Sequence, residues 1–402
     1  MTQGKASSDA REKVVSPVFL LVTFSTFAYF LTVGAILPVL PRYVEGPLAS
    51  GNVAVGLATG AFAITAVLLR PFVGRVSDRR GRRILIIGGG LGVGLTVAGY
   101  ALTDALVPLI ILRLITGVGE AAFYVGVASV VNDLAPDARR GEALSYFSLA
   151  LFGGLALGPV FAEPLLEAAG FHSVWLAAGA SAMVAGVVGF LVPDTRPPGV
   201  AEGPPGRIVH PAALRPGSIL ATHIWALATF SSFVTLYALS LGMEGSRYVF
   251  AFHSAIVLLI RGFGARLPDI LGPRRSTRTA LTCTAIGLGI MGIWGTPVGL
   301  FVATGVFSLG HSLAFPALMT LAIRSAPPTE RGAVVGTFTA FFDAAFGIGA
   351  IAAGTLADAV GYRGSFIGAA LVALFGLGLT FGYARGARKE EERIDPEAAA
   401  TR

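Results

Sequence analysis

The sequence predicts an all-α membrane protein in which twelve transmembrane helices form two pseudo-symmetric bundles of six. Three observations support this fold class: an apolar composition, twelve apolar segments and an internal repeat. Only 13% of the 402 residues are charged, against about 25% in soluble proteins, and 54% are hydrophobic. A soluble fold of this length cannot bury so much apolar surface, and disordered chains are rich in charge. Lipid is therefore the main solvent of this chain.

Twelve segments are long and apolar enough to cross a bilayer, whose core of about 30 Å requires roughly 20 residues of helix. The first segment, which begins at Val18, is longer than the core of a signal peptide, so we expect it to remain as a span. The predicted spans are residues 18–41, 53–74, 84–103, 106–131, 142–165, 173–193, 219–241, 247–267, 279–296, 298–323, 333–357 and 363–384.

One long polar stretch, residues 194–218, divides the spans into six and six. It is polar and rich in proline, which helix interiors do not tolerate, so we predict an interdomain linker there. The predicted organisation is an N-terminal tail (1–17), a first bundle (18–193), this linker (194–218), a second bundle (219–385) and a C-terminal tail (386–402).

The basic residues predict the orientation in the membrane. An even number of spans places both termini on one side, and 26 of the 30 lysines and arginines then fall on that same side. Cytoplasmic segments carry such an excess, so we expect both termini and the linker to be cytoplasmic. The net charge of +7 is spread over alternate loops and forms no single patch, so we do not expect nucleic-acid binding.

An internal repeat relates the two halves of the chain. Adding 191 to a residue number carries Arg70 onto Arg261, and it also superimposes the pairs Gly119 and Gly310, Gly170 and Gly361, and Arg140 and Arg331. We call this constant shift the repeat offset. It matches each span to the span six places later, so the two halves run parallel and enclose a space between two similar bundles.

The loop after the second span carries the sequence Gly74-Arg-Val-Ser-Asp78-Arg-Arg-Gly81-Arg-Arg83. This loop resembles the G-x-x-x-D-R-x-G-R-R signature of the major facilitator superfamily, and a degraded copy lies between Arg261 and Arg274. Positive-inside charge alone would explain the arginines but not the acid and the two glycines. The resemblance implies that Asp78 pairs with arginines and with a helix N-terminus in one conformation. The implied conformational latch comprises Gly74, Asp78, Arg79, Gly81, Arg82, Arg83, Asp269 and Arg274.

The fourth span places Arg113, Gly117 and Glu120 on one helix face, at positions i, i+4 and i+7. Charged side chains within a membrane are costly and usually face the protein interior, where they have a partner. A structural ion pair between Arg113 and Glu120 is one explanation. The resemblance favours a functional one, since an arginine followed by this glycine pattern is associated with proton-coupled members of the family.

A second acid, Asp343, lies near the middle of the eleventh span. We expect Glu120, Asp343 or both to accept a coupling proton, with Arg113 tuning them. His311, which the repeat pairs with Glu120, is equally consistent with packing and with function. The predicted substrate cavity comprises His311, Gly117, Tyr124 and Thr339.

The fifth span contains Gly154, Gly158 and Pro159, which resemble a motif of the exporter branches of the family. The match ends at residues 161–163, where Glu163 stands near the position of a glycine in the motif. Ordinary close packing of glycine-rich helices is the alternative explanation. The motif favours export.

The resemblance and these residues together predict a secondary active transporter of the cell inner membrane, not an enzyme. We expect proton-coupled, alternating-access export of a small amphipathic molecule such as a drug, metabolite or sugar, by a monomer with no cofactor except the proton. Uptake of a sugar or organic acid by symport or facilitated diffusion is the main alternative. A lipid enzyme or a non-transporting receptor is more remote. The single cysteine, Cys283, excludes disulfide, four-cysteine zinc and iron–sulfur sites within the chain.

Overall fold

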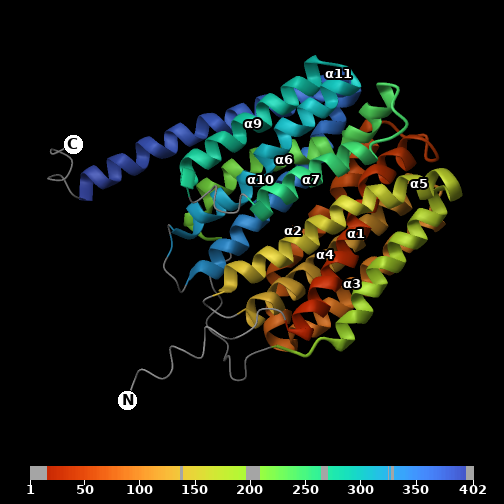
Figure 1. Cartoon of the computed structure of the whole chain (residues 1–402), viewed down its shortest axis with the longest axis horizontal. Coiled ribbons are helices and arrows are strands. Elements are labelled where there is room, and N and C mark those ends of the chain that lie inside the picture. Colours follow the sequence, from red (N-terminus) through yellow and green to blue (C-terminus); the bar gives the residue numbers. More distant parts are fainter. Residues whose placement is uncertain are drawn as a thin grey trace.

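A computed structural model describes residues 16–135, 139–195, 209–263, 270–324, 326 and 330–394. Within these ranges the chain is helical and contains no β-strand (Figure 1). The α-helices are α1 (Pro17–Glu45), α2 (Asn52–Arg80), α3 (Arg82–Gly99), α4 (Leu106–Leu134), α5 (Arg140–Val188), α6 (Pro211–Ser240), α7 (Arg247–Phe263), α9 (Pro273–Ile293), α10 (Pro297–Arg324) and α11 (Arg331–Ile394). Two 3₁₀ turns, η2 (Tyr100–Leu102) and η4 (Gly189–Leu191), follow α3 and α5.

Two of these helices each contain two spans. α5 breaks at Gly170, with φ of 77°, and α11 breaks at Gly361, with φ of 74°. Glycine occupies this left-handed region without the steric cost that a Cβ brings, so the chain can reverse direction there. The ten labelled α-helices of the described residues therefore provide the twelve predicted helical segments. The predicted all-α fold is confirmed.

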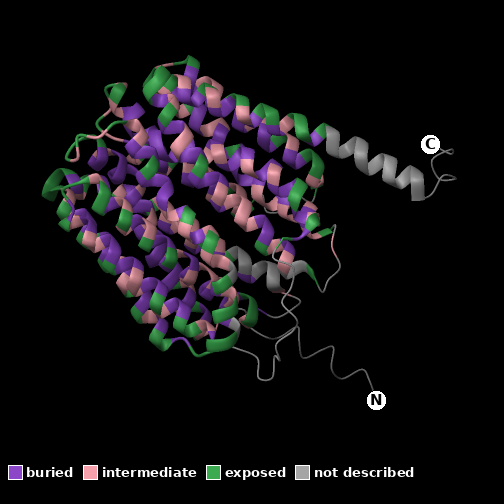
Figure 2. Ribbon diagram, turned by 180° about the vertical axis from the view of Figure 1, so that it is seen from behind, coloured by how far each residue is buried: buried purple, intermediate pink, exposed green. Residues whose placement is uncertain are grey.

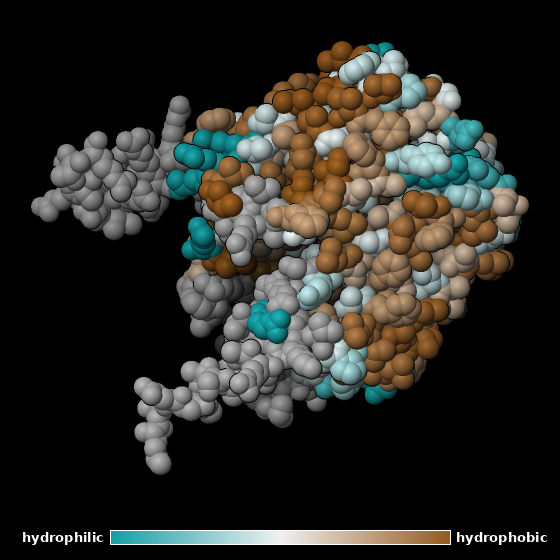
Figure 3. Space-filling view, in the orientation of Figure 1, coloured by the Kyte–Doolittle hydropathy of each residue, from teal (hydrophilic) through white to brown (hydrophobic). Residues whose placement is uncertain are grey.

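Among the described residues, eight helices are long and apolar enough to cross a membrane by length and composition, two of them being the kinked α5 and α11. The remaining two, α7 and α9, are weaker by these criteria. α7 has only 17 residues, and α9 begins with a cluster of arginines. Large apolar side chains point outward, including Leu68 (63% exposed) and Phe263 (90% exposed). Figure 3 shows apolar atoms over much of one face, which suits a surface in contact with lipid.

The start of α6 differs from the sequence prediction. The prolines of residues 211–218 predict a linker, but α6 begins at Pro211. Proline is accommodated in the first turn, where its missing N–H has no helical partner, and the His210 ring accepts a hydrogen bond from the Ala212 N–H at 3.2 Å. Pro216 removes one further backbone donor without ending the helix. Residues 196–208 of the predicted linker, most of the predicted N-terminal tail and the end of the C-terminal tail lie outside the described residues.

The internal repeat is visible in backbone geometry. Gly170 and Gly361, which the repeat offset pairs, break α5 and α11 with the same left-handed conformation. Gly81 and Gly272, which the same offset pairs, have φ of 93° and 74° and cap the N-termini of α3 and α9. Glycines that are one repeat offset apart thus make similar turns in the two halves.

The packing of helices repeats in the same way. A Cβ on Gly119 of α4 would lie 3.0 Å from the carbonyl oxygen of Gly89 on α3. A Cβ on Gly310 of α10 would lie 2.5 Å from the carbonyl oxygen of Ala280 on α9. The repeat offset carries both members of the first contact onto those of the second. The two halves are therefore parallel repeats that pack alike.

The two halves lie side by side. In Figure 1, α1–α5 form one bundle, coloured red to yellow-green, and α6–α11 form the other, coloured green to blue. α2 packs against α11 and α5 packs against α7 across the interface, which we call the seam. Figure 2 shows buried residues along the inner faces of the helices and exposed residues toward their ends.

Candidate functional site

The seam is tight at one end. A Cβ on Gly56 of α2 would lie 2.3 Å from the carbonyl oxygen of Ala350 on α11, and one on Gly60 would lie 2.6 Å from that of Gly347. Small residues permit this backbone contact. We call this the closed end of the seam; it includes the N-termini of α2 and α7.

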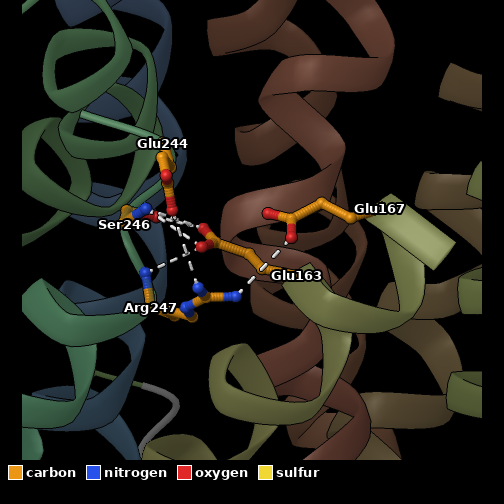
Figure 4. Close-up of polar contacts among 5 residues, drawn as sticks. All are labelled: Glu163, Glu167, Glu244, Ser246 and Arg247. Atoms are coloured by element: carbon orange, nitrogen blue, oxygen red, sulfur yellow. Dashed lines mark hydrogen bonds and ion pairs between the residues drawn. The ribbon is translucent and has the colours of Figure 1, made fainter. Parts of the chain in front are cut away.

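A buried carboxylate fastens α5 to α7 at the closed end (Figure 4). Glu163 is 0% exposed and accepts hydrogen bonds from the backbone N–H groups of Ser246 and Arg247, each at 2.9 Å, and from the Ser246 hydroxyl at 2.7 Å. A carboxylate is stabilised at a helix N-terminus, where N–H groups are free and the helix dipole is positive. Glu167 and Glu244 lie 3.7 and 3.9 Å from the Arg247 guanidinium and add weaker ion pairs.

A second carboxylate fastens α11 to α2. Asp358 accepts hydrogen bonds from the Asn52 N–H at 3.1 Å, from the Asn52 side-chain amide at 2.8 Å and from the Val53 N–H at 3.3 Å. Each half thus supplies one carboxylate that caps a helix of the other half. We call Glu163 and Asp358 the clamp carboxylates. The sequence analysis assigns this role to neither residue, although Glu163 stands out there as a departure from the glycine motif.

An ion pair marks the inner limit of the seam between α2 and α11. Arg70 donates to Asp343 at 2.9 Å, and a second nitrogen of its guanidinium contacts the other carboxylate oxygen. Farther along the two helices, Gly74 and Gly336 face open space. α2 and α11 therefore separate beyond this ion pair, toward the end of the molecule that carries the loop at Gly81.

A small cavity of ≈ 60 Å³ lies at the seam and contains Glu120. It can hold a few water molecules and is far smaller than the roughly 300–1,000 Å³ of ordinary ligand pockets. A substrate of ordinary size therefore needs a rearrangement of the halves. The lining residues are Tyr29, Thr32, Val33, Ile36, Leu37, Leu40, Pro41, Thr59, Phe62, Val93, Arg113, Thr116, Glu120, Ser231 and Phe346.

Arg113 and Glu120 have different environments within this cavity. Arg113 donates to the backbone carbonyls of Ala58 at 2.7 Å and Thr59 at 3.0 Å and lies 4.8 Å above the Phe62 ring. Glu120 forms no hydrogen bond or ion pair with any of the described residues, although the charges of Arg113, Arg70 and Asp343 act on it. The structure thus shows no direct Arg113–Glu120 pair: the arginine is fixed by backbone and the carboxyl group is free.

Two of the residues predicted to line the substrate cavity lie against backbone atoms in the structure. A Cβ on Gly117 would lie 2.0 Å from the Phe62 carbonyl oxygen, so this glycine allows α4 to pack against α2. The Thr339 hydroxyl donates to the Val335 carbonyl of its own helix at 3.0 Å. Neither residue lines the cavity that contains Glu120.

The other two predicted cavity residues lie on either side of the seam. His311 is 8% exposed, and its Nδ1 lies 3.1 Å from Nε2 of His223, inside the second half. Tyr124 lies on the first half under the Arg70 guanidinium, 5.6 Å from ring centre to Cζ. The His253 ring lies 5.4 Å from the His311 ring at a tilt of 39° and hydrogen-bonds with Ser308, so the three histidines form one cluster in which His223 and His311 are buried.

The predicted latch is described in part. Gly81 caps α3, the Arg82 N–H donates to Asp194 at 3.1 Å, and the Arg82 side chain forms an ion pair with Asp133 at 2.5 Å. Asp194 thereby places a carboxylate at the N-terminus of α3, and the role that the resemblance implies for Asp78 stays a prediction.

The other residues of the predicted latch lie partly outside the described residues and partly on the surface. The side chain of Asp78 and the whole of Asp269 lie outside the described residues. Arg79 and Arg274 are exposed, and Arg83 donates to the Phe190 carbonyl.

The glycines of the fifth span pack against α1. A Cβ on Gly154 would lie 2.6 Å from the Phe27 carbonyl oxygen, and one on Gly158 would lie 2.4 Å from the Ala35 nitrogen. Pro159 lies within α5, which continues past it. Close packing inside the first half therefore accounts for both glycines.

Comparison with known proteins agrees with this architecture. The family model of the Major Facilitator Superfamily matches residues 22–283 and 240–402. An uncharacterized transporter of this type from Pseudomonas aeruginosa is 31% identical, over 96% of this chain and 97% of its own. A relative from Salmonella typhimurium is 28% identical, over 88% and 93% of the two chains.

Solved structures share the fold. A bacterial homologue of the human lysosomal transporter Spinster superimposes with a TM-score of 0.76 at 15% identity, covering 92% of this chain and 96% of its own. The nucleoside transporter NupG superimposes with a TM-score of 0.72 at 13% identity, covering 91% and 99%. These proteins are transporters and not enzymes. From the family match, the relatives and the parallel six-helix repeats, this chain is a multi-pass membrane protein that belongs to the Major Facilitator Superfamily of transporters.

Proposed function

We propose that the chain is a proton-coupled exporter of a small amphipathic molecule in the cell inner membrane, working as a monomer by alternating access. The observation that carries this proposal is Glu120, which lines a cavity at the seam between the two halves and whose carboxyl group has no hydrogen-bond or ion-pair partner among the described residues. A transporter needs such a group, because a proton carrier must be reachable from the cavity and must not be locked in an ion pair.

The orientation follows from the basic residues. With both termini in the cytoplasm, the closed end faces outward and the structure is inward-facing. Outward opening then requires the clamp carboxylates to release the helix N-termini that they cap. Closure at the inner side brings α2 and α11 together beyond Arg70 and Asp343.

The ionisable groups at the seam couple the movement of protons to the movement of the substrate. Glu120 takes up a proton when the cavity opens outward and releases it when the cavity opens inward. Asp343 holds Arg70 only while it is ionised, so a proton on Asp343 competes with the ion pair that joins α2 to α11. The membrane potential contributes about 2.3 kcal/mol per charge per 100 mV.

The cavity wall supports an amphipathic substrate. Aromatic side chains (Tyr29, Phe62 and Phe346) and several aliphatic ones line the cavity together with the two ionisable residues Arg113 and Glu120. Binding sites of this composition hold an apolar body and fix it with few polar contacts.

The test uses inside-out membrane vesicles with an acidified interior and a fluorescent reporter of the pH gradient. Compounds are taken from a growth screen in which the expressing strain survives a toxic panel better than a strain with the Glu120→Gln variant. We expect an exported compound to dissipate the gradient as protons leave in exchange. Proton movement together with the compound would indicate symport, and compound movement without protons would indicate facilitated diffusion; either result rejects the proposal.

A further inference from the structure

The second half contains the repeat counterpart of the Arg70–Asp343 ion pair, but with a different partner. The repeat offset carries Arg70 onto Arg261 and Phe152 onto Asp343. In the structure, Arg261 of α7 lies 4.1 Å above the ring of Phe152 on α5. Both arginines thus reach across the seam to equivalent positions, where one finds a carboxylate and the other finds an aromatic ring.

The guanidinium of Arg261 has no counter-charge among the described residues. Its Nε is buried without a hydrogen-bond partner, and it forms no ion pair with a carboxylate that the structure describes. The titratable groups near it are Tyr124 on the first half and His311 on the second. Neither of these is a carboxylic acid, and an uncompensated buried charge is costly.

The balance of charge at the seam points to a missing anion. Arg70 is neutralised by Asp343, and Arg113 and Glu120 share one cavity with opposite charges. Among the residues that the structure describes, Arg261 is left with one unbalanced positive charge at the second contact between the halves. A guanidinium offers up to five N–H donors in a fork that matches an oxyanion.

We propose that Arg261 binds the anionic group of the substrate, which makes the transported molecule an amphipathic organic anion, such as a carboxylate on an aromatic or aliphatic body. The inference rests on the proposed function and names its substrate class. The anion would take the part that Asp343 takes at the other contact. Phe152 and Tyr124 from the first half would contact the substrate while Arg261 from the second half holds its charge, so the substrate would join the two halves.

The test compares three probes that share one apolar body: 3-phenylpropionate, the neutral 3-phenylpropanamide and the cationic 3-phenylpropylamine. Their affinities for the purified full chain are measured by thermal stabilisation. We expect the acid to bind about 10- to 100-fold more tightly than the amide, as a charge-assisted pair provides. Arg261→Gln should remove this preference and Arg261→Lys should restore part of it.

A matched control is Arg278→Gln. Arg278 also lies in the second half and also stacks on an aromatic ring, Phe381 at 4.3 Å, but it is away from the seam. This variant should keep the wild-type preference. The melting temperature of ligand-free Arg261→Gln should stay close to that of the wild type, since the substitution loses the stacking on Phe152 but removes a charge that has no counter-charge among the described residues.

Three outcomes overturn the proposal: a wild-type protein that binds none of the probes, one that prefers the amide or the amine, or an Arg261→Gln variant that still prefers the acid. Proton flux in vesicles separates this failure from that of the proposed function. Flux that depends on Glu120 with a cationic compound would reject the anion site but keep proton coupling. Arg261-dependent binding of the acid without proton movement would keep the anion site but reject proton coupling.

Discussion

Replacing Glu120 with glutamine is expected to reduce substrate-dependent proton flux to the level of vesicles without the protein. Glu120 forms no hydrogen bond or ion pair with the described residues, so glutamine of equal shape should leave the fold and the melting temperature close to the wild type. The loss should exceed about 100-fold, because the variant lacks the group that exchanges the proton. The measurement is the rate of gradient dissipation in inside-out vesicles.

Asp343→Asn provides the comparison for this result. It should also impair coupling, but with a lower melting temperature, since it leaves the largely buried Arg70 without its carboxylate. Asp104→Asn, at an exposed side chain between η2 and α4, should behave as the wild type. If Glu120→Gln retains full proton flux, the proposed proton carrier is wrong.

Replacing Glu163 with glutamine is expected to open the closed end of the seam. The substitution removes the negative charge from the N-terminus of α7 and brings an amide donor toward the N–H groups of Ser246 and Arg247. A buried hydrogen bond to a charged group contributes about 1.5–3 kcal/mol, which corresponds to a population shift of about tenfold or more.

The reporter for this opening is a cysteine at Ser231, which lines the cavity and is buried, in a background in which Cys283 is serine. A membrane-impermeant maleimide added outside intact cells should label this cysteine at least tenfold faster in Glu163→Gln. Glu167→Gln is the control, because that side chain is half exposed and touches only the Arg247 guanidinium at 3.7 Å. Equal labelling of the wild type and Glu163→Gln would contradict the clamp.

The fold could be predicted from the sequence because each of its determinants is local or periodic. The length of an apolar segment identifies a transmembrane span, and the constant repeat offset identifies the duplication of the two halves. The glycines that this offset pairs, Gly170 and Gly361, are the ones that break α5 and α11. The start of α6 is not predicted, because proline in a first turn looks like a linker when only composition is considered.

The candidate site could be predicted only in part. A charged residue in an apolar span is visible in the sequence, and this identified Glu120, Asp343 and Arg113. Their partners are not visible, because helix periodicity defines a face but not the helix that it meets. The pairing of Arg70 with Asp343 spans 273 positions, and Glu163 meets Ser246 through a contact between the two halves. The repeat offset could have predicted Arg261 opposite Phe152 once the first pair was known.

The tilting of two parallel halves about the seam is the central claim, and distances between spin labels at its two ends test it most directly. One label pair, at Val107 and Val298, reports on the closed end, and another, at Asn132 and Arg324, reports on the opposite end, both with Cys283 replaced by serine. When both clamp carboxylates are changed to amides, the first distance should lengthen and the second should shorten. Distances that stay fixed, or that change in the same direction, would contradict alternating access by these halves.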